Sequence, residues 1–120
     1  MTLLAQIMVG IVAALHLGFL VLEMFLWNTP RGRATFGTTR DFAAESATLA
    51  ANQGLYNGFL AAGLVWSLVA ADPVGFQTKV FFLVCAMIAG LYGATTVNLR
   101  ILFVQAVPAA LALAAVLLTR

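Results

Sequence analysis

Two ionisable side chains lie inside one long apolar stretch near the start of the chain, and they are the first candidates for chemistry. His16 and Glu23 are seven residues apart. In a helix this spacing puts them on one face, about 10 Å apart along the axis, so a water or another side chain has to join them. An acid inside a bilayer costs about 2.5–3.5 kcal/mol and usually faces a cavity or a partner. We expect Glu23 to accept a proton or a cation, with His16 at the floor of the site.

The densest polar cluster follows in a second apolar stretch, where three amides and a phenol fall within six positions. These residues are Asn52, Gln53, Tyr56 and Asn57. They form two i, i+4 pairs, which cover a broad face of a helix. Such a face can bind a ligand, or its amides can join neighbouring helices by hydrogen bonds. Gly54 and Gly58 form a G-x-x-x-G pattern beside it, which allows close helix packing within the chain or between two copies.

Four apolar stretches must position these residues. The 120-residue chain is 63% hydrophobic and only 8% charged, and its mean hydropathy is +1.05. A soluble domain of this size cannot bury so much apolar surface, which excludes a soluble enzyme. We expect an all-α bundle of four transmembrane helices at about 3–27, 40–71, 75–97 and 100–118, each near the length that a bilayer requires. They would form a single membrane domain over residues 1–120, with a cytoplasmic loop at 28–39.

The basic residues predict how these helices are oriented. Positive charges close to the ends of spans are retained on the cytoplasmic side. Four arginines belong to the first and third loops, namely Arg31, Arg33, Arg40 and Arg100. Lys79 and Arg120 fall on the opposite side, together with the Asp72-Pro73 turn. We therefore expect both termini on the outer side. Thr38 and Asp41 fit a capping box, so the second helix should begin near Thr39, before its apolar stretch.

Polar groups of all four helices reach a similar depth. At about 1.5 Å per residue from the expected cytoplasmic boundary, Glu23, the amide cluster, Tyr92 and Gln105 all lie about 5–12 Å deep. Gly90 and Gly93 let the third helix approach its neighbours, and Pro108 bends the fourth. This shared level predicts a polar pocket open to the cytoplasm and centred on Glu23.

Several other chemistries lack the residues that they need. A metal centre requires three or four ligands, which His16 and Glu23 do not supply, and no second histidine exists for a bis-histidine haem. Cys85 lies in the outer half of its helix, away from the expected partners of His16, and no serine is spaced for a catalytic triad. Six basic residues are too few for a nucleic-acid surface. We therefore expect no metal, no cofactor and no nucleic acid.

Several local strings of this chain resemble those of the DUF1304 family of small bacterial membrane proteins. They are residues 16–23, 23–27 (EMFLW), 29–32 (TPRG), 36–37 (FG), 51–61 (ANQGLYNGFLA), 89–93 (AGLYG) and 105–109 (QAVPA). The resemblance covers essentially the whole chain. It implies a four-helix protein of the bacterial inner membrane and names no reaction.

Three functions remain open. The leading hypothesis is binding or transport of a small cationic or hydrogen-bonding solute at Glu23. Small multidrug transporters, which work as dimers, offer an analogy of size and of a lone acid only. The second is an accessory subunit whose apolar faces dock a larger membrane complex. The third, an enzyme that acts on a lipid head group with Glu23, His16 and Tyr56, is less favoured. Beyond the lipid bilayer, the partners to consider are a small solute, a homodimer or a larger complex.

Overall fold

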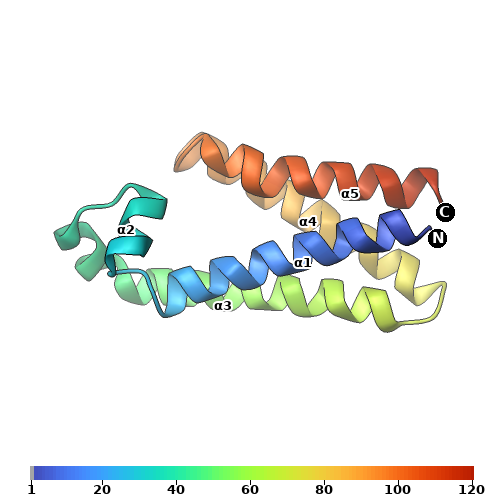
Figure 1. Cartoon of the computed structure of the whole chain (residues 1–120), viewed down its shortest axis with the longest axis horizontal. Coiled ribbons are helices and arrows are strands. Elements are labelled where there is room, and N and C mark those ends of the chain that lie inside the picture. The colour runs from blue at the N-terminus through green and yellow to red at the C-terminus, as the bar shows by residue number, and fades with distance from the viewer. Residues whose placement is uncertain (1) are drawn as a thin grey trace. The chain divides into compact units, whose positions relative to one another are not determined.

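The fold of the chain is all-α in a computed structural model that describes residues 2–120 (Figure 1). Helices account for 85% of the structure. The α-helices are α1 (Leu3–Met24), α2 (Pro30–Phe36), α3 (Arg40–Val69), α4 (Val74–Thr96) and α5 (Val107–Leu118), and a π-helical turn, η1 (Leu102–Ala106), precedes α5. The expected all-α class is confirmed. Two of these helices, α1 and α4, are long and apolar enough to cross a membrane.

The loop expected at residues 28–39 contains the short helix α2. Thr29 is its N-cap and accepts a hydrogen bond from the backbone N–H of Gly32 at 3.2 Å, and Pro30 occupies the first turn. Gly37 ends the helix with φ +68°, a left-handed conformation that glycine adopts without a steric penalty. These residues are ordinary start and stop signals of a helix. The prediction of a loop over residues 28–39 is therefore wrong for Pro30–Phe36, although the local sequence indicates a helix there.

Helix α3 begins at Arg40, within one residue of the expected start, but with a different cap. The hydroxyl of Thr39 accepts a hydrogen bond from the N–H of Phe42 at 3.1 Å. The hydroxyl of Thr38, which we expected to cap the helix, is buried and has no partner within residues 2–120. The capping pattern is therefore shifted by one residue, because Thr39 directly precedes the first helical residue.

The chain divides into two compact units, and α1 and α3 each contribute to both. Unit 1 joins the residues up to Leu15 with Leu60–Arg120. Its core is built from small and branched side chains of α1, α3, α4 and α5. They are Ala5, Val9, Val12, Ala13, Leu64, Leu83, Ala112 and Val116. The small alanines allow the helices to approach each other closely, as is common where helices associate without water.

The π-helical turn in unit 1 follows from the position of Pro108. Proline has no N–H, and its ring clashes with the carbonyl four residues earlier. The N–H of Val107 instead bonds to the carbonyl of Leu102, five residues back, and α5 then continues with Pro108 in its first turn. Gly90 of α4 lies against this turn, since a Cβ at Gly90 would be 2.6 Å from the backbone nitrogen of Ala106.

Unit 2, His16–Phe59, contains the end of α1, all of α2 and the first two-thirds of α3. Gly54 and Gly58 of α3 lie against α1. A Cβ at Gly54 would be 2.7 Å from Cγ of Met24, and one at Gly58 would be 2.6 Å from Cδ1 of Leu20. The G-x-x-x-G pattern thus makes a close helix contact inside the chain.

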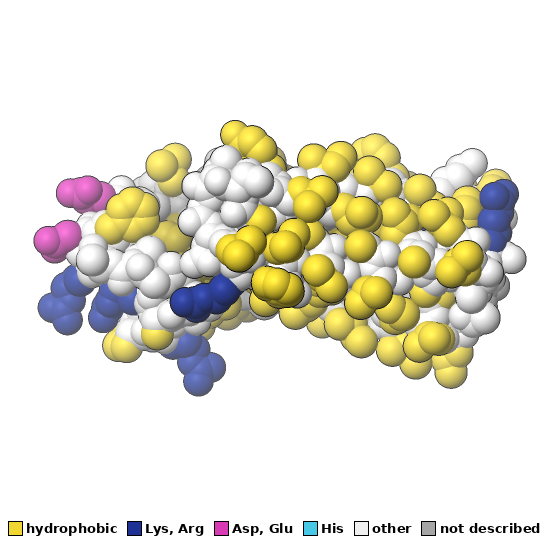
Figure 2. All heavy atoms as spheres, turned by 90° about the horizontal axis from the view of Figure 1, so that it is seen from above, with side chains coloured by type: hydrophobic (Ala, Val, Ile, Leu, Met, Phe, Trp, Pro, Cys, Tyr) yellow, Lys and Arg dark blue, Asp and Glu magenta, His cyan; other side chains and the backbone are white. Residues whose placement is uncertain are grey.

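Most of the apolar surface of the long helices is exposed. Only 22% of the apolar window of α1 and 28% of that of α4 is buried. Exposed leucine, isoleucine, valine and phenylalanine side chains occur along every long helix, and hydrophobic side chains cover much of the face seen in Figure 2. Large exposed apolar surfaces of this kind mark sites of interaction with a membrane or with another protein.

Candidate functional site

The side-chain amide of Asn57 donates a hydrogen bond to Oε1 of Glu23. Glu23 is the penultimate residue of α1, and Asn57 faces it from α3. The amide is 94% buried, with 6% exposed, whereas Glu23 is half-buried. Gly54 lies one turn away from Asn57 on the same face, and a Cβ there would be only 3.1 Å from Cβ of Glu23. The missing side chain at Gly54 therefore lets the carboxylate and the amide meet.

Glu23 has no cationic partner within its own unit. Of the three arginines of unit 2, Arg33 donates to the carbonyl and the side-chain oxygen of Asn28, both at 2.9 Å, and Arg31 and Arg40 are exposed. The hydrogen bond from Asn57 reaches only one carboxylate oxygen, Oε1. The carboxylate thus has a neutral donor on one of its two oxygens.

His16 is completely buried, two turns before Glu23 on α1. Its ring packs edge-on against Phe19, with 5.3 Å between the ring centroids and an interplanar angle of 72°. Within unit 2, the imidazole of His16 thus contacts an aromatic ring of the same helix.

The other members of the amide cluster do not join Glu23. Asn52, Gln53 and Tyr56 are exposed, and 55% of Tyr56 is accessible while its ring contacts Phe59 edge-on. Successive helical residues are about 100° apart, so the face that carries Asn57 towards α1 carries Tyr56 away from it. The cluster thus separates into one buried amide and three outward-facing side chains.

The remaining predicted site residues belong to unit 1. Tyr92 is 70% exposed on α4, whereas Gln105 is buried within the π-helical turn. Gly93 lies against Ile101, with a Cβ position 3.1 Å from Cγ2 of that residue. Gly90, Gly93 and Pro108 therefore all lie at the junction of α4 with η1 and α5.

A comparison with protein-family models identifies the group to which this chain is related. The model described as "Protein of unknown function (DUF1304)" matches residues 10–117. The chain belongs to the DUF1304 family. This confirms the resemblance seen in the sequence and covers α1 from its third turn to the last turn of α5. Neither the curated proteins nor the solved structures contain a significant match.

A second polar group of this DUF1304 chain was missed by sequence reasoning. Lys79 of α4 is only 5% exposed, and its ammonium donates to the backbone carbonyl of Ser67, near the end of α3. The last carbonyls of a helix lack intrahelical partners and carry partial negative charge, so a cation there is favourable. The sequence interpretation of Lys79 is that of an orienting charge only; the available signal is a lone lysine inside an apolar stretch, six residues after Pro73.

The Trp27 side chain joins α3 and α2 in this DUF1304 member. Its Nε1 donates to the hydroxyl of Ser46 at 3.0 Å, and that hydroxyl donates to the carbonyl of Phe42 at 2.6 Å. The indole also packs on Phe36 of α2, with 4.9 Å between centroids. These contacts hold the segment that follows Glu23 in a fixed arrangement within unit 2.

Proposed function

We propose that this DUF1304 member is a four-span membrane protein that binds a small cationic or hydrogen-bond-donating solute at Glu23. The observation that carries the proposal is a half-buried carboxylate in a membrane-compatible helix, paired with the neutral amide of Asn57. The proposed location is the inner membrane of a bacterium, with the Glu23 end towards the cytoplasm.

The exposure of the long helices supports a membrane location. The core helix of a soluble protein is mostly buried, whereas three-quarters or so of the apolar windows of α1 and α4 are accessible. Helix α3 has 30 residues, about 45 Å at 1.5 Å per residue, which exceeds the roughly 30 Å of a hydrocarbon core. The segment Leu102–Leu118 is apolar and 17 residues long, about 26 Å by the same measure. These lengths support four spans.

The negative charge of Glu23 at the C-terminal end of α1 is electrostatically unfavourable. The C-terminal end of a helix carries partial negative charge and favours basic side chains. Glu23 is nevertheless in the last turn of α1, and that turn contains no basic residue. A carboxylate kept there with a neutral donor is best explained by a positive or proton-donating group that arrives from outside the chain.

Asn57 would orient the carboxylate instead of neutralising it. A charge-assisted hydrogen bond to one carboxylate oxygen fixes the plane of the group. The other oxygen remains available for an ammonium or an N–H donor of the solute. This arrangement provides binding with a defined geometry. Tyr56, which the enzyme hypothesis requires beside Glu23, is exposed on another face of α3, which favours binding or transport over catalysis.

Binding can be tested by native mass spectrometry of the protein in mild detergent. The probes are choline, spermidine and tetraphenylphosphonium, three organic cations that differ in size and in hydrogen-bond donors. We expect Glu23→Gln to weaken the bound cation at least tenfold, about 1.4 kcal/mol. Glu45→Gln is the matched control, because Glu45 is an exposed glutamate of α3.

Equal binding by the wild type, Glu23→Gln and Glu45→Gln would contradict the proposal. A wild-type protein without any cation adduct, but with a co-purifying larger protein, would favour the accessory-subunit hypothesis instead.

The orientation is tested separately with a membrane-impermeant maleimide. In a Cys85→Ser background, Ala34→Cys lies in α2 and Thr119→Cys lies after α5. We expect labelling of position 119 from outside intact cells and of position 34 only after permeabilisation. Labelling of both positions from the same side would exclude the four-span arrangement.

A further inference from the structure

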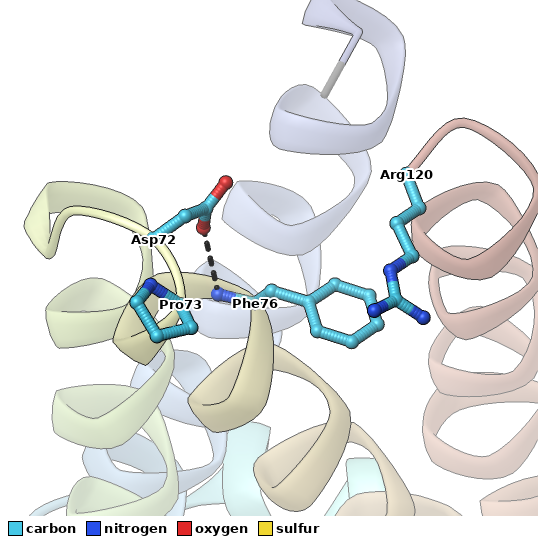
Figure 3. A pocket seen from close by; sticks show the side chains of 4 residues that line it. All are labelled: Asp72, Pro73, Phe76 and Arg120. Atoms are coloured by element: carbon cyan, nitrogen blue, oxygen red, sulfur yellow. Dashed lines mark hydrogen bonds between the residues drawn. The ribbon is translucent and has the colours of Figure 1, made fainter.

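A small open pocket lies at the end of unit 1 where α4 begins and α5 ends. Its volume is about 160 Å³, and it is lined by Asp72, Pro73, Phe76 and Arg120 (Figure 3). The first and last described segments meet at the same end, because the hydroxyl of Thr2 donates to that of Thr119 at 3.3 Å. The apolar helices α4 and α5 stop within two residues of the pocket. In a bilayer this is the level of the lipid headgroups.

The pocket has one acidic and one basic side. Oδ1 of Asp72 accepts the N–H of Phe76 at 3.0 Å, which fixes the carboxylate at the start of α4. The guanidinium carbon of Arg120 lies 4.4 Å from the centroid of the Phe76 ring, a cation–π contact. Figure 3 shows the two charged groups on either side of this ring.

Both charged side chains are accessible to a ligand. Asp72 and Arg120 are exposed, and Asp72 also interacts electrostatically with Lys79 of α4, whose ammonium bonds to the carbonyl of Ser67. The ring of Phe76 orients the guanidinium without using its N–H donors. A ligand that complements this pocket therefore carries a negative group for Arg120 and a positive, hydrogen-bond-donating group for Asp72.

We propose that the pocket binds the headgroup of an amine-bearing phospholipid, a phosphate ester linked through two carbons to a primary ammonium. A guanidinium matches the oxygens of a phosphate in a two-point contact. The ammonium donates to the free oxygen of Asp72. The volume of about 160 Å³ is similar to that of a cavity of about 150 Å³ that holds a benzene molecule, so the pocket has room for a phosphate and a two-carbon amine.

The charge pattern discriminates among phospholipids. Phosphatidylglycerol has the phosphate and lacks the amine, so it can use Arg120 and leaves Asp72 without a partner. Phosphatidylcholine has a positive charge but no N–H donor, so it cannot bond to the carboxylate. Phosphatidylethanolamine alone among the three satisfies both sides. The same chemistry is present in free phosphoethanolamine, and the experiment must separate the two sources.

The test is native mass spectrometry of the full chain in detergent, titrated with each of the three lipids and with free phosphoethanolamine. We expect phosphatidylethanolamine to bind about tenfold more tightly than the other two lipids. Arg120→Gln should weaken phosphatidylethanolamine and phosphatidylglycerol alike, about tenfold. Asp72→Asn should weaken only phosphatidylethanolamine, and its amide oxygen can still accept the N–H of Phe76.

Arg31→Gln is the matched control, because it removes an exposed arginine from α2 in the other unit. Equal affinity of all three lipids, or binding unchanged by both Arg120→Gln and Asp72→Asn, would overturn the proposal. Free phosphoethanolamine that binds as tightly as the lipid would assign the site to a soluble phosphate ester, whereas much weaker binding assigns it to the membrane.

The inference rests on the membrane location in the proposed function and is independent of solute binding at Glu23. Glu23→Gln should leave phosphatidylethanolamine affinity unchanged. If Glu23→Gln loses cation binding and retains lipid binding, the two sites are separate. Arg120→Gln should show the opposite result, with lipid binding lost and cation binding retained.

Discussion

The close contact between Gly90 of α4 and the π-helical turn predicts that Gly90→Ala destabilises the protein. A Cβ at position 90 would lie 2.6 Å from the nitrogen, 2.8 Å from Cβ and 2.9 Å from Cα of Ala106. Real Cβ atoms essentially never approach other atoms closer than 3.0 Å. Two of the three atoms belong to the backbone, so no change of rotamer can relieve the clash. Gly90→Ala must therefore push α4 and η1 apart.

Moving α4 and η1 apart should lower the stability of the Gly90→Ala variant. Overpacking of a close contact costs about 1–3 kcal/mol in the free energy of unfolding. Gly10→Ala is the matched control, because Gly10 is also within a long helix of unit 1 and no atom lies within 4 Å of its Cβ position. There the same substitution should stabilise the helix by up to about 1 kcal/mol. The two variants should thus differ in sign.

The measurement is unfolding in mixed micelles with an increasing fraction of sodium dodecyl sulfate, followed by far-ultraviolet circular dichroism. Adding Ala106→Gly to Gly90→Ala should restore only part of the loss, because it removes the contact with Cβ and keeps those with the nitrogen and Cα. If Gly90→Ala unfolds at the same detergent fraction as Gly10→Ala, the close approach of α4 to η1 is wrong.

Three further predictions concern other parts of the chain. A double-mutant cycle of Glu23→Ala and Asn57→Ala should give a coupling free energy of about 1 kcal/mol in the same unfolding assay, and a value near zero would exclude the hydrogen bond. Gly37→Ala should cost about 1 kcal/mol because φ is +68°, and Gly37→Asn should cost less; equal losses would contradict the left-handed cap. Lys79, the only lysine, should react with an amine-reactive ester much more slowly in the folded protein than after denaturation, as measured by peptide mass spectrometry, whereas equal rates would show that it is exposed.

The helices were predictable because their signals are local. Apolar stretches of sufficient length and the turn residues between them located α1, α3, α4 and the α5 region to within a few residues. The helix α2 has equally local signals in Thr29, Pro30 and Gly37, but its seven residues are too few for a periodic pattern. The start and stop residues, and not the number of residues, therefore indicate a helix between positions 28 and 39.

The candidate site was harder to predict because it depends on which face of a helix meets its neighbour. Depth alone grouped Tyr56 with Asn57, although the two side chains point in different directions. Gly54 and Gly58 mark the face of α3 that contacts α1, and Asn57 lies three residues after the first of them. The glycines thus contained the information that separates the buried amide from its exposed neighbours.

Glu23 and Lys79 differ in how far the fold explains their positions. The ammonium of Lys79 donates to a carbonyl near the C-terminal end of α3. The partial negative charge at that helix end favours a cation. Its burial therefore has a structural cause in the contact with Ser67. Glu23 places an anion at the same kind of helix end, where that partial charge opposes it, and Asn57 supplies a hydrogen bond without a charge. The solute site that we propose is therefore centred on Glu23 and not on Lys79.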